Sequence, residues 1–138
     1  LDEIALKKAR DGIFPLEHMK EYSENYAQAG GKASLSDYYT SAGYDHVIFR
    51  QSLRQNVVFS HHNLATDSSF NEFNVILCRN VMIYFNPKLQ NRVHGLLYES
   101  LRRFGVLALG HKESLKGTAY EPRYEEISGR ERIYRRRD

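Results

Sequence analysis

The stretch CRNVMIYF, residues 78–85, carries the polar side chains of the sequence that most need an explanation. Arg79 and Asn80 follow the apolar residues 75–77 and interrupt an otherwise apolar run. Burying such groups without hydrogen-bond partners costs about 2–7 kcal/mol. We therefore expect the chain to turn to the surface here, or a polar ligand to meet both side chains. A purely structural role, with Arg79 capping neighbouring carbonyl groups, stays open.

Polar clusters follow three separate strand-like runs of the sequence. They are residues 61–63 (His-His-Asn), Arg79 with Asn80, and Gly110 with His111. In an open α/β sheet the carboxyl ends of the strands face the ligand crevice. We therefore expect the three clusters to converge on one edge of a sheet, which would make a binding site there.

Metal and thiol chemistry fit this sequence poorly. His61 and His62 are adjacent, so they point to opposite faces of a strand, and no carboxylate stands at a ligand-like spacing. Cys78 ends an apolar strand, which raises the pKa of a thiol, and no base is adjacent to it. We expect no metal site and a buried, unreactive cysteine. Neither a P-loop nor a GxGxxG motif is present.

A strand–helix–strand pattern must position these clusters. Residues 73–78 are almost wholly apolar, which is typical of a strand buried on both faces of a parallel sheet. Pro87 stands where a helix begins, and the helical pattern runs to about Arg103. Residues 106–110 form a second candidate strand, so the segment predicts a βαβ unit. The buried stripe of the helix is expected to be Val93, Leu96, Leu97 and Leu101.

The first part of the chain predicts two helices and then a hairpin. Apolar residues recur at helical spacing over residues 1–14 and again over residues 16–29. A connector rich in Ser, Thr and Tyr follows. Residues 46–50 and 56–61 are strand-like, and residues 51–55 between them predict a long hairpin turn. At the other end of the chain, residues 124–136 predict a β-hairpin that turns at Ser-Gly.

Length and composition indicate a globular domain in a reducing compartment. The chain has 138 residues, of which 41% are hydrophobic, enough for one sizeable core. The single cysteine excludes an internal disulfide, so we expect a cytoplasmic location. The net charge of +3 lies largely in residues 130–137, which we interpret as a solvated end, and it does not demand a nucleic-acid partner. No apolar run approaches the roughly 20 residues of a membrane span.

The segment FNVILCRNVMIYFNPKLQNRV, followed by VLALGHKESL, closely resembles the carboxyl-terminal domain of CheR-type chemotaxis receptor methyltransferases. ARDGIFP and VVFSHHNL resemble upstream segments of the same family, so the match is collinear over nearly the whole chain. The resemblance implies an α/β fold with a Rossmann-like methyltransferase sheet. It also implies methyl transfer from S-adenosylmethionine, which becomes S-adenosylhomocysteine, to glutamate side chains of chemoreceptors.

The resemblance also implies roles for individual residues. Asn63 and Leu64 match contacts on the adenine side of the cofactor. Arg79 and Asn80 match cofactor contacts at the end of the fourth strand, which would answer the question of what these two side chains meet. Tyr84 matches a tyrosine near the methyl-transfer centre, and we take it as the catalytic candidate.

A small antiparallel subdomain is inserted into the family's domain, and it maps to about residues 38–55 of this chain. In relatives this subdomain helps to dock the receptor. Arg50 and Arg54 are our candidates for docking the cytoplasmic domain of a chemoreceptor. No membrane insertion and no nucleic-acid binding are expected.

The family's glycine-rich cofactor loop and its basic amino-terminal helical domain are not found in this sequence. The acidic residue that holds the ribose falls just before Leu1, and Asp2 is a weak substitute. We therefore expect an amino-terminally truncated sheet without its first strands, whose open edges invite pairing with another chain. Rearranged packing, a swapped dimer or a partner fragment are the three expected outcomes. We expect the chain alone to be inactive.

Two other functions are weighed against methyl transfer to receptors. A truncated methyltransferase domain could serve as a non-catalytic receptor-binding or signalling module. A nucleic-acid methyltransferase is the other alternative, suggested by the basic residues 130–137. Base methyltransferases often carry N/D-P-P-Y/F after the fourth strand, where this chain has RNVM, and this argues against base methylation.

Overall fold

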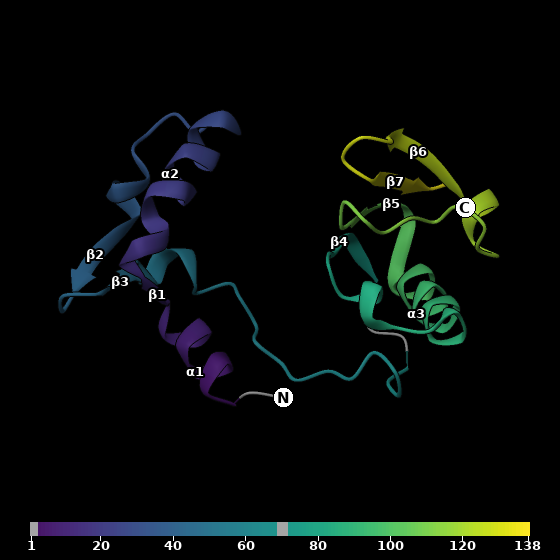
Figure 1. Cartoon of the computed structure of the whole chain (residues 1–138), viewed down its shortest axis with the longest axis horizontal. Coiled ribbons are helices and arrows are strands. Elements are labelled where there is room, and N and C mark those ends of the chain that lie inside the picture. The colour runs from purple at the N-terminus through teal and green to yellow at the C-terminus, as the bar shows by residue number, and fades with distance from the viewer. Residues whose placement is uncertain (1–2, 69–71) are drawn as a thin grey trace. The chain divides into compact units, whose positions relative to one another are not determined.

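The computed structural model describes residues 3–68 and 72–138, and the chain divides into two compact units (Figure 1). The first unit is Leu1–His61 and the second is His62–Asp138. Each unit has its own sheet, a three-stranded one in the first and a four-stranded one in the second. No helix among the described residues is long and apolar enough to cross a membrane.

The first unit is built around a small antiparallel sheet with the strand order β1-β3-β2. Val47 in the central strand is fully buried, and Met19 at the start of α2 is 3% exposed. These are the two buried hydrophobic side chains among the described residues of this unit. The elements are α1 (Glu3–Asp11), β1 (Ile13–Pro15), η1 (Leu16–His18), α2 (Met19–Gln28), η2 (Leu35–Tyr38), β2 (Tyr39–Ala42), β3 (His46–Phe49) and η3 (Gln51–Leu53).

The first predicted helix is shorter than its apolar pattern indicates. It ends at Asp11, and Gly12 takes a φ of +69°, a left-handed conformation that glycine adopts without steric cost. The chain turns at this glycine, and Ile13 then pairs with Ile48 of β3. Residues 13–14 are therefore strand rather than helix.

The predicted strand at residues 56–61 is wrong. After η3 the chain has no regular secondary structure up to His62, so residues 51–55 are not the turn of a hairpin. Val58 is 91% exposed. A strand needs a neighbour for its backbone N–H and C=O groups, and β4 pairs only with β5 among the described residues. The parallel pairing of residues 57–60 with β4, our sign of a rearranged sheet, is not found in the described part of the chain.

The second unit contains the predicted βαβ arrangement and the predicted hairpin. Its strand order is β4-β5-β7-β6, in which β4 and β5 are parallel and the other neighbours are antiparallel. This mixed sheet with its crossover helix confirms the predicted Rossmann-like α/β fold. The elements are β4 (Phe73–Cys78), η4 (Met82–Tyr84), α3 (Pro87–Ser100), β5 (Leu101–Leu109), η5 (Glu121–Arg123), β6 (Tyr124–Ser128) and β7 (Ile133–Arg136).

Helix α3 begins where its capping residues place it. The Asn86 side chain accepts a hydrogen bond from the backbone N–H of Leu89 at 2.9 Å, and Pro87 occupies the first turn, where its missing N–H is not needed. The predicted buried stripe is confirmed. Val93, Leu96 and Leu97 are 6% exposed or less, and the fourth predicted member, Leu101, is also buried but belongs to β5.

The helix ends earlier and β5 begins earlier than predicted. Helix α3 ends at Ser100, and Leu101 already pairs with Phe73 of β4. The predicted break at Phe104 exists, but inside the strand: Phe104 has a φ of +61°, and the register with β4 shifts beside it. Apolar periodicity could not distinguish these residues from a last helical turn, because Leu101 is buried in either conformation.

Strand β4 is not buried on both faces, contrary to the sequence-based prediction. Phe73, Val75 and Leu77 are 42%, 57% and 73% exposed, whereas Cys78 is 7% exposed. These exposed residues alternate along the strand, so they share one face of the sheet. The other face packs through Ile76 and Cys78 into the core of the second unit. The apolar composition of β4 is typical of a strand that is covered on both faces. Among the described residues, however, other residues cover only one face of β4.

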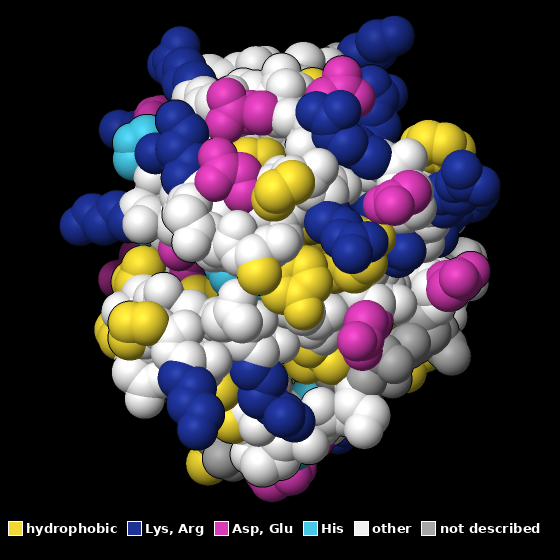
Figure 2. Space-filling view, turned by 90° about the vertical axis from the view of Figure 1, so that its right-hand side faces the viewer, with side chains coloured by type: hydrophobic (Ala, Val, Ile, Leu, Met, Phe, Trp, Pro, Cys, Tyr) yellow, Lys and Arg dark blue, Asp and Glu magenta, His cyan; other side chains and the backbone are white. Residues whose placement is uncertain are grey.

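The basic end of the chain is partly structural rather than simply solvated. The Arg136 guanidinium lies 4.0 Å from the centre of the Tyr98 ring and donates hydrogen bonds to the carbonyl oxygens of Tyr98, at 2.9 Å, and Leu101. These carbonyls are at the carboxyl end of α3, where a cation is favoured. On the face shown in Figure 2, acidic side chains lie between the Lys and Arg side chains, so the basic residues form no continuous patch there.

Arg136→Ala should lower the free energy of unfolding by about 1–3 kcal/mol, because two carbonyl groups lose a charged donor. Chemical denaturation followed by circular dichroism measures this change. Arg135→Ala is the matched control on the same strand, since Arg135 pairs with the exposed Glu125 at 2.9 Å and should contribute less than about 1 kcal/mol. Equal losses in both variants would contradict the capping role of Arg136.

Candidate functional site

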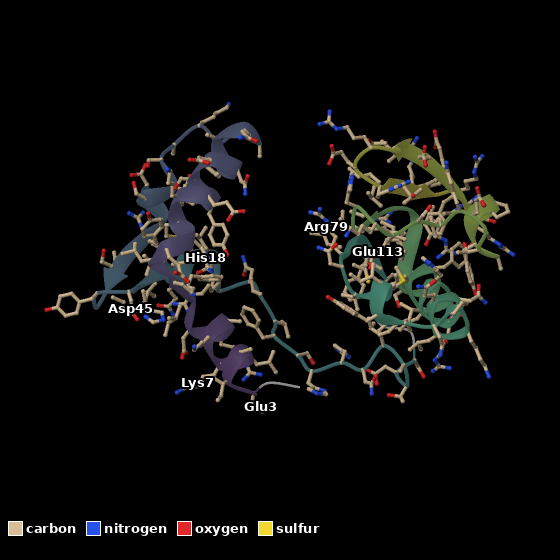
Figure 3. The ribbon with its side chains drawn as sticks, in the orientation of Figure 1. Glu3, Lys7, His18, Asp45, Arg79 and Glu113 are labelled. Carbon is tan, nitrogen blue, oxygen red and sulfur yellow. The ribbon has the colours of Figure 1, made fainter. Side chains whose placement is uncertain are left out.

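The loops that follow β4 and β5 meet at a single buried carboxylate, that of Glu113 (Figure 3). Its Oε2 accepts hydrogen bonds from the backbone N–H groups of Asn80, at 3.0 Å, and Gly110, at 2.7 Å. Its Oε1 accepts from Val81, at 2.9 Å, and Met82, at 2.7 Å. One side chain therefore fixes the backbone of both loops at the carboxyl ends of the two parallel strands.

This carboxylate is ionised over the physiological pH range. Glu113 is 5% exposed, and burial works to raise its pKa. The hydrogen bonds from four backbone N–H groups outweigh burial and hold the pKa of Glu113 below its usual range. Burial, with a smaller contribution from the negative charge of Glu113, raises the pKa of the Cys78 thiol to about 11. The cysteine is thus buried and protonated, which confirms the prediction from its apolar surroundings.

The loop after β4 has a special backbone conformation at Asn80. Its φ is +59°, the left-handed region that asparagine tolerates better than most residues with a side chain. Gly110 lies directly against it: a Cβ atom at Gly110 would be 2.5 Å from Asn80 Oδ1 and 2.7 Å from Asn80 N. The two loops are therefore in close contact only because residue 110 has no side chain.

Two of the three predicted clusters are brought together. The loop of Arg79 and Asn80 contacts the loop that begins at Gly110, as expected for neighbouring parallel strands. Arg79 is exposed and has no hydrogen-bond or ion-pair partner among the described residues. Tyr84, on the η4 turn that follows, is 81% exposed. Both side chains are thus accessible to a ligand.

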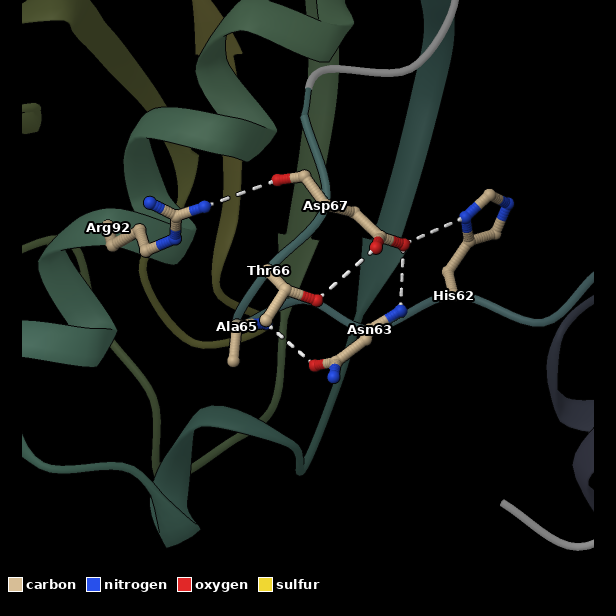
Figure 4. Close-up of polar contacts among 6 residues, drawn as sticks. All are labelled: His62, Asn63, Ala65, Thr66, Asp67 and Arg92. Atoms are coloured by element: carbon tan, nitrogen blue, oxygen red, sulfur yellow. Dashed lines mark hydrogen bonds and ion pairs between the residues drawn. The ribbon is translucent and has the colours of Figure 1, made fainter.

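The third cluster forms a compact turn of its own, which Figure 4 shows. The Asp67 carboxylate accepts hydrogen bonds from the backbone N–H of Asn63, at 2.8 Å, and from the His62 ring, at 3.2 Å. The Asn63 side-chain oxygen accepts from the N–H of Ala65 at 3.0 Å. The hydrogen bond from Asn63, opposed by burial and helped by His62, lowers the pKa of Asp67. Among the described residues, the side-chain NH₂ group of Asn63 has no hydrogen-bond partner.

This turn is attached to the second unit, but the predicted cluster is divided. Leu64 is partly buried and packs against the core of the second unit. The Arg92 side chain of α3 donates to the Asp67 carbonyl at 3.5 Å. His61 belongs to the first unit, whereas His62 and Asn63 belong to the second. The convergence of all three clusters on one edge therefore stays a prediction.

The two arginines predicted to dock a receptor differ in their surroundings. Arg50 is exposed. Arg54 is partly buried, its guanidinium donates to the carbonyl oxygen of Arg10, and its side chain lies against Gly12. Arg54 is thus already engaged within the first unit, and Arg50 is the more accessible of the two.

Sequence reasoning did not identify Glu113 as a site residue. Its signal was its place in VLALGHKESL, the segment that resembles the family, three residues after the predicted end of an apolar strand at Gly110. A carboxylate there can reach back to the loop between the strands, which spacing alone does not reveal. Over residues 3–68 and 72–138, no group of three or more His, Cys, Asp or Glu side chains is arranged to hold a metal ion.

Comparison with known proteins gives a consistent assignment. The family described as "CheR methyltransferase, SAM binding domain" matches residues 1–131. A Pseudomonas putida protein named "Putative methyltransferase Cher3" is 48% identical over 132 residues, which are 96% of this chain and 48% of that protein. The "Chemotaxis protein methyltransferase" of Listeria monocytogenes is 33% identical over 119 residues, 86% of this chain and 42% of that protein. The chain thus spans about half the length of these relatives, or less.

Proposed function

This chain belongs to the CheR methyltransferase family, as its S-adenosylmethionine-binding domain, and we propose that it takes part in methyl transfer to glutamate side chains of chemoreceptors. The observation that carries this proposal is the Glu113 carboxylate, which fixes the loops bearing Asn80 and Gly110 at the ends of the parallel strands. Loops at this edge of an α/β sheet are where ligands bind. Relatives named for chemotaxis support the choice of substrate.

The groups available in this region fit S-adenosylmethionine, the cofactor of this domain family. Arg79 offers an exposed cation for the carboxylate of the methionine part. The NH₂ group of Asn63, which has no partner in the described part of the chain, and the apolar side chain of Leu64 suit the adenine side. Asn80, whose backbone N–H is bound by Glu113, keeps its carboxamide for the ligand. We propose these four residues as the cofactor contacts.

The chemistry asks for alignment rather than for acid–base catalysis. When bound, S-adenosylmethionine supplies a methyl group on a sulfonium, which is a good leaving group. A glutamate side chain has a reference pKa of about 4.3, so it is already ionised at pH 7 and needs no general base. The chain has to hold donor and acceptor in line and exclude water. An exposed tyrosine close to these loops can serve the alignment, and we propose that the Tyr84 hydroxyl orients the acceptor carboxylate or the methyl donor.

Tyr84→Phe should lower kcat for receptor methylation at least tenfold in the full-length protein, because the orienting hydroxyl is lost. The affinity for S-adenosylhomocysteine should stay within twofold of wild type, since Tyr84 is 81% exposed and the fold does not depend on it. Kinetics with a chemoreceptor cytoplasmic fragment measure the first quantity, and calorimetric titration measures the second. Unchanged turnover would remove Tyr84 from the mechanism.

Calorimetric titration of the full-length protein with S-adenosylhomocysteine tests the proposed function itself. Micromolar binding that weakens at least tenfold in Arg79→Ala is the expected result for the full-length protein. We propose that the 138-residue chain alone is inactive, because about half the length of its relatives lies outside the match. Wild-type full-length protein that binds no S-adenosylhomocysteine would overturn the proposal.

Docking is the second part of the proposal. Residues 38–55, with Arg50 and Arg54, would contact the cytoplasmic domain of the receptor, and Arg50 is the freer of the two side chains. A cytoplasmic location follows from that partner and fits the single reduced cysteine. A strand from another segment, a swapped copy or a partner fragment would complete the sheet along β4. A pull-down with the receptor fragment tests the proposed docking, and sedimentation tests whether another chain completes the sheet.

One observation favours the alternative of a non-catalytic receptor-binding or signalling module. The exposed apolar face of β4 offers Val75 and Leu77 to a partner. The calorimetric titration separates the two functions. Receptor binding without cofactor binding would support the module.

A further inference from the structure

A pocket of about 280 Å³ lies beside the proposed methyl-transfer site. It is bounded by η4, by α3 and by the loop that follows β5. The lining residues Met82 and Ile83 directly precede Tyr84 on η4, and on this ground we relate the pocket to the position proposed for the acceptor. Its lining residues are Met82, Ile83, Gln90, His94, Lys112, Glu113 and Ser114.

Two of the polar groups in this pocket are already committed to the protein backbone. Both oxygens of the Glu113 carboxylate accept backbone N–H hydrogen bonds. The side-chain nitrogen of Gln90 donates to the carbonyl oxygens of Met82, at 3.0 Å, and Phe85, at 3.1 Å. The negative charge of Glu113 is therefore stabilised from within, and it is not available to bind a cation in the pocket.

The remaining polar groups of the pocket are a cation and two neutral groups that can donate hydrogen bonds. Lys112 is exposed and has no ion-pair partner among the described residues. The Ser114 oxygen accepts a hydrogen bond from Lys116 N–H at 3.0 Å, so its own O–H proton is free to be donated. His94 is 4% exposed, and its Nδ1 has no hydrogen-bond partner in the described structure.

His94 contributes no second positive charge at neutral pH. Burial lowers its pKa, and the nearby negative charge of Glu113 opposes that effect without cancelling it. A neutral imidazole carries one N–H donor and one acceptor. The lining therefore holds the ionised Glu113, whose two oxygens are occupied by four backbone N–H groups, together with one ammonium group and neutral hydrogen-bonding groups. The groups that are left for a ligand, one cation and neutral donors, suit a ligand with a single negative charge.

We propose that this pocket binds a carboxylate of the acceptor protein, an acidic side chain close to the glutamate that is methylated. Lys112 would supply the opposite charge and the Ser114 hydroxyl a hydrogen bond. The inference rests on the proposed function, because that function makes the acceptor a protein carboxylate beside Tyr84. A phosphate dianion would need more cationic donors than the single lysine of this pocket.

Steady-state methylation by the full-length protein tests the pocket, with a chemoreceptor cytoplasmic fragment as the acceptor. Lys112→Gln should raise KM for the fragment five- to twentyfold, with kcat and the affinity for S-adenosylhomocysteine within twofold of wild type. Lys112→Arg should keep KM within threefold, since the charge remains. Lys88→Gln, an exposed lysine on α3 that does not line the pocket, is the matched control and should not alter KM.

The outcomes separate failure of the pocket from failure of the proposed function. Wild-type activity with equal KM in Lys112→Gln and Lys88→Gln would overturn the pocket alone. If the wild type neither binds S-adenosylhomocysteine nor methylates, the proposed function fails, and titration of the protein with glutarate decides the pocket. Saturable NMR shifts of His94 and Ser114 that disappear in Lys112→Gln support it. No shifts with glutarate, or equal shifts with inorganic phosphate, overturn carboxylate binding.

Discussion

Glu113→Gln should destabilise the second unit by about 2–5 kcal/mol, the largest loss expected from a single isosteric change in this chain. Each carboxylate oxygen accepts two backbone N–H hydrogen bonds, so a glutamine must turn its NH₂ group toward two donors. Each buried donor left without an acceptor costs about 1–3 kcal/mol. Denaturant unfolding measures the loss, and S-adenosylhomocysteine affinity should fall with it because the loop of Asn80 is no longer fixed.

The pH dependence of this loss identifies its cause. The folded-state pKa of Glu113 is depressed, so its contribution is fully present above the unfolded-state pKa of about 4.3 and is lost as pH falls through the folded-state value. The difference between wild type and Glu113→Gln should therefore be large at pH 7 and shrink below about pH 4.3. A difference that does not change with pH would point to packing instead. Glu121→Gln, exposed and bound to one N–H group at 2.8 Å, is the control and should lose less than about 1 kcal/mol.

Gly110→Ala should have the second largest effect, about 1–3 kcal/mol or more, with loss of cofactor binding. The new Cβ would lie 2.5 Å from Asn80 Oδ1, 2.6 Å from Glu113 Oε2 and 2.7 Å from Asn80 N. Neither the backbone nitrogen nor the fully bonded carboxylate can move without breaking the contacts between the two loops. Unfolding midpoints and S-adenosylhomocysteine titration measure the two consequences.

A second glycine provides the comparison for this substitution. A Cβ at Gly129, in the turn between β6 and β7, would meet only the Glu126 carboxylate, at 2.7 Å for its nearest atom. Glu126 is exposed and flexible, so it can move aside at little cost. Gly129→Ala should therefore change stability by less than about 1 kcal/mol. Similar losses in both variants would mean that tight packing at Gly110 is not the cause.

The sequence was sufficient for the βαβ unit and the terminal hairpin because their signals are local. Pro87 and Asn86 define the start of α3, and a stripe of leucines and valine defines its buried side. The strand predicted at residues 56–61 failed for a non-local reason. Apolar residues can form a strand only beside another strand, and none of the described residues provides one there. The prediction that β4 is covered on both faces also failed for a non-local reason. Its apolar residues do not show whether other residues cover the second face.

The sequence singled out the exposed residues of the candidate site, whose roles stay predictions, and not the residue that fixes their loops. Arg79 and Asn80 stood out because polar groups in an apolar run need an explanation, and Tyr84 came from the family resemblance. Glu113 was given no role, although it lies in the GHKE part of the segment that resembles the family. Its role depends on backbone N–H groups, and every residue except proline has one, so no side-chain pattern reveals them. Its function became apparent only from the distances between the two loops.

Because Cys78 is buried, the reactivity of its thiol can report how often this part of the protein opens. The thiol is the single cysteine of the chain, lies at the end of β4 and has a pKa of about 11. Alkylating reagents react with the thiolate, so the closed state is protected by both burial and protonation. The rate at which iodoacetamide labels the native protein therefore measures how often the end of β4 separates from the core. Ligands that clamp the adjoining loops should slow that labelling in proportion to their occupancy.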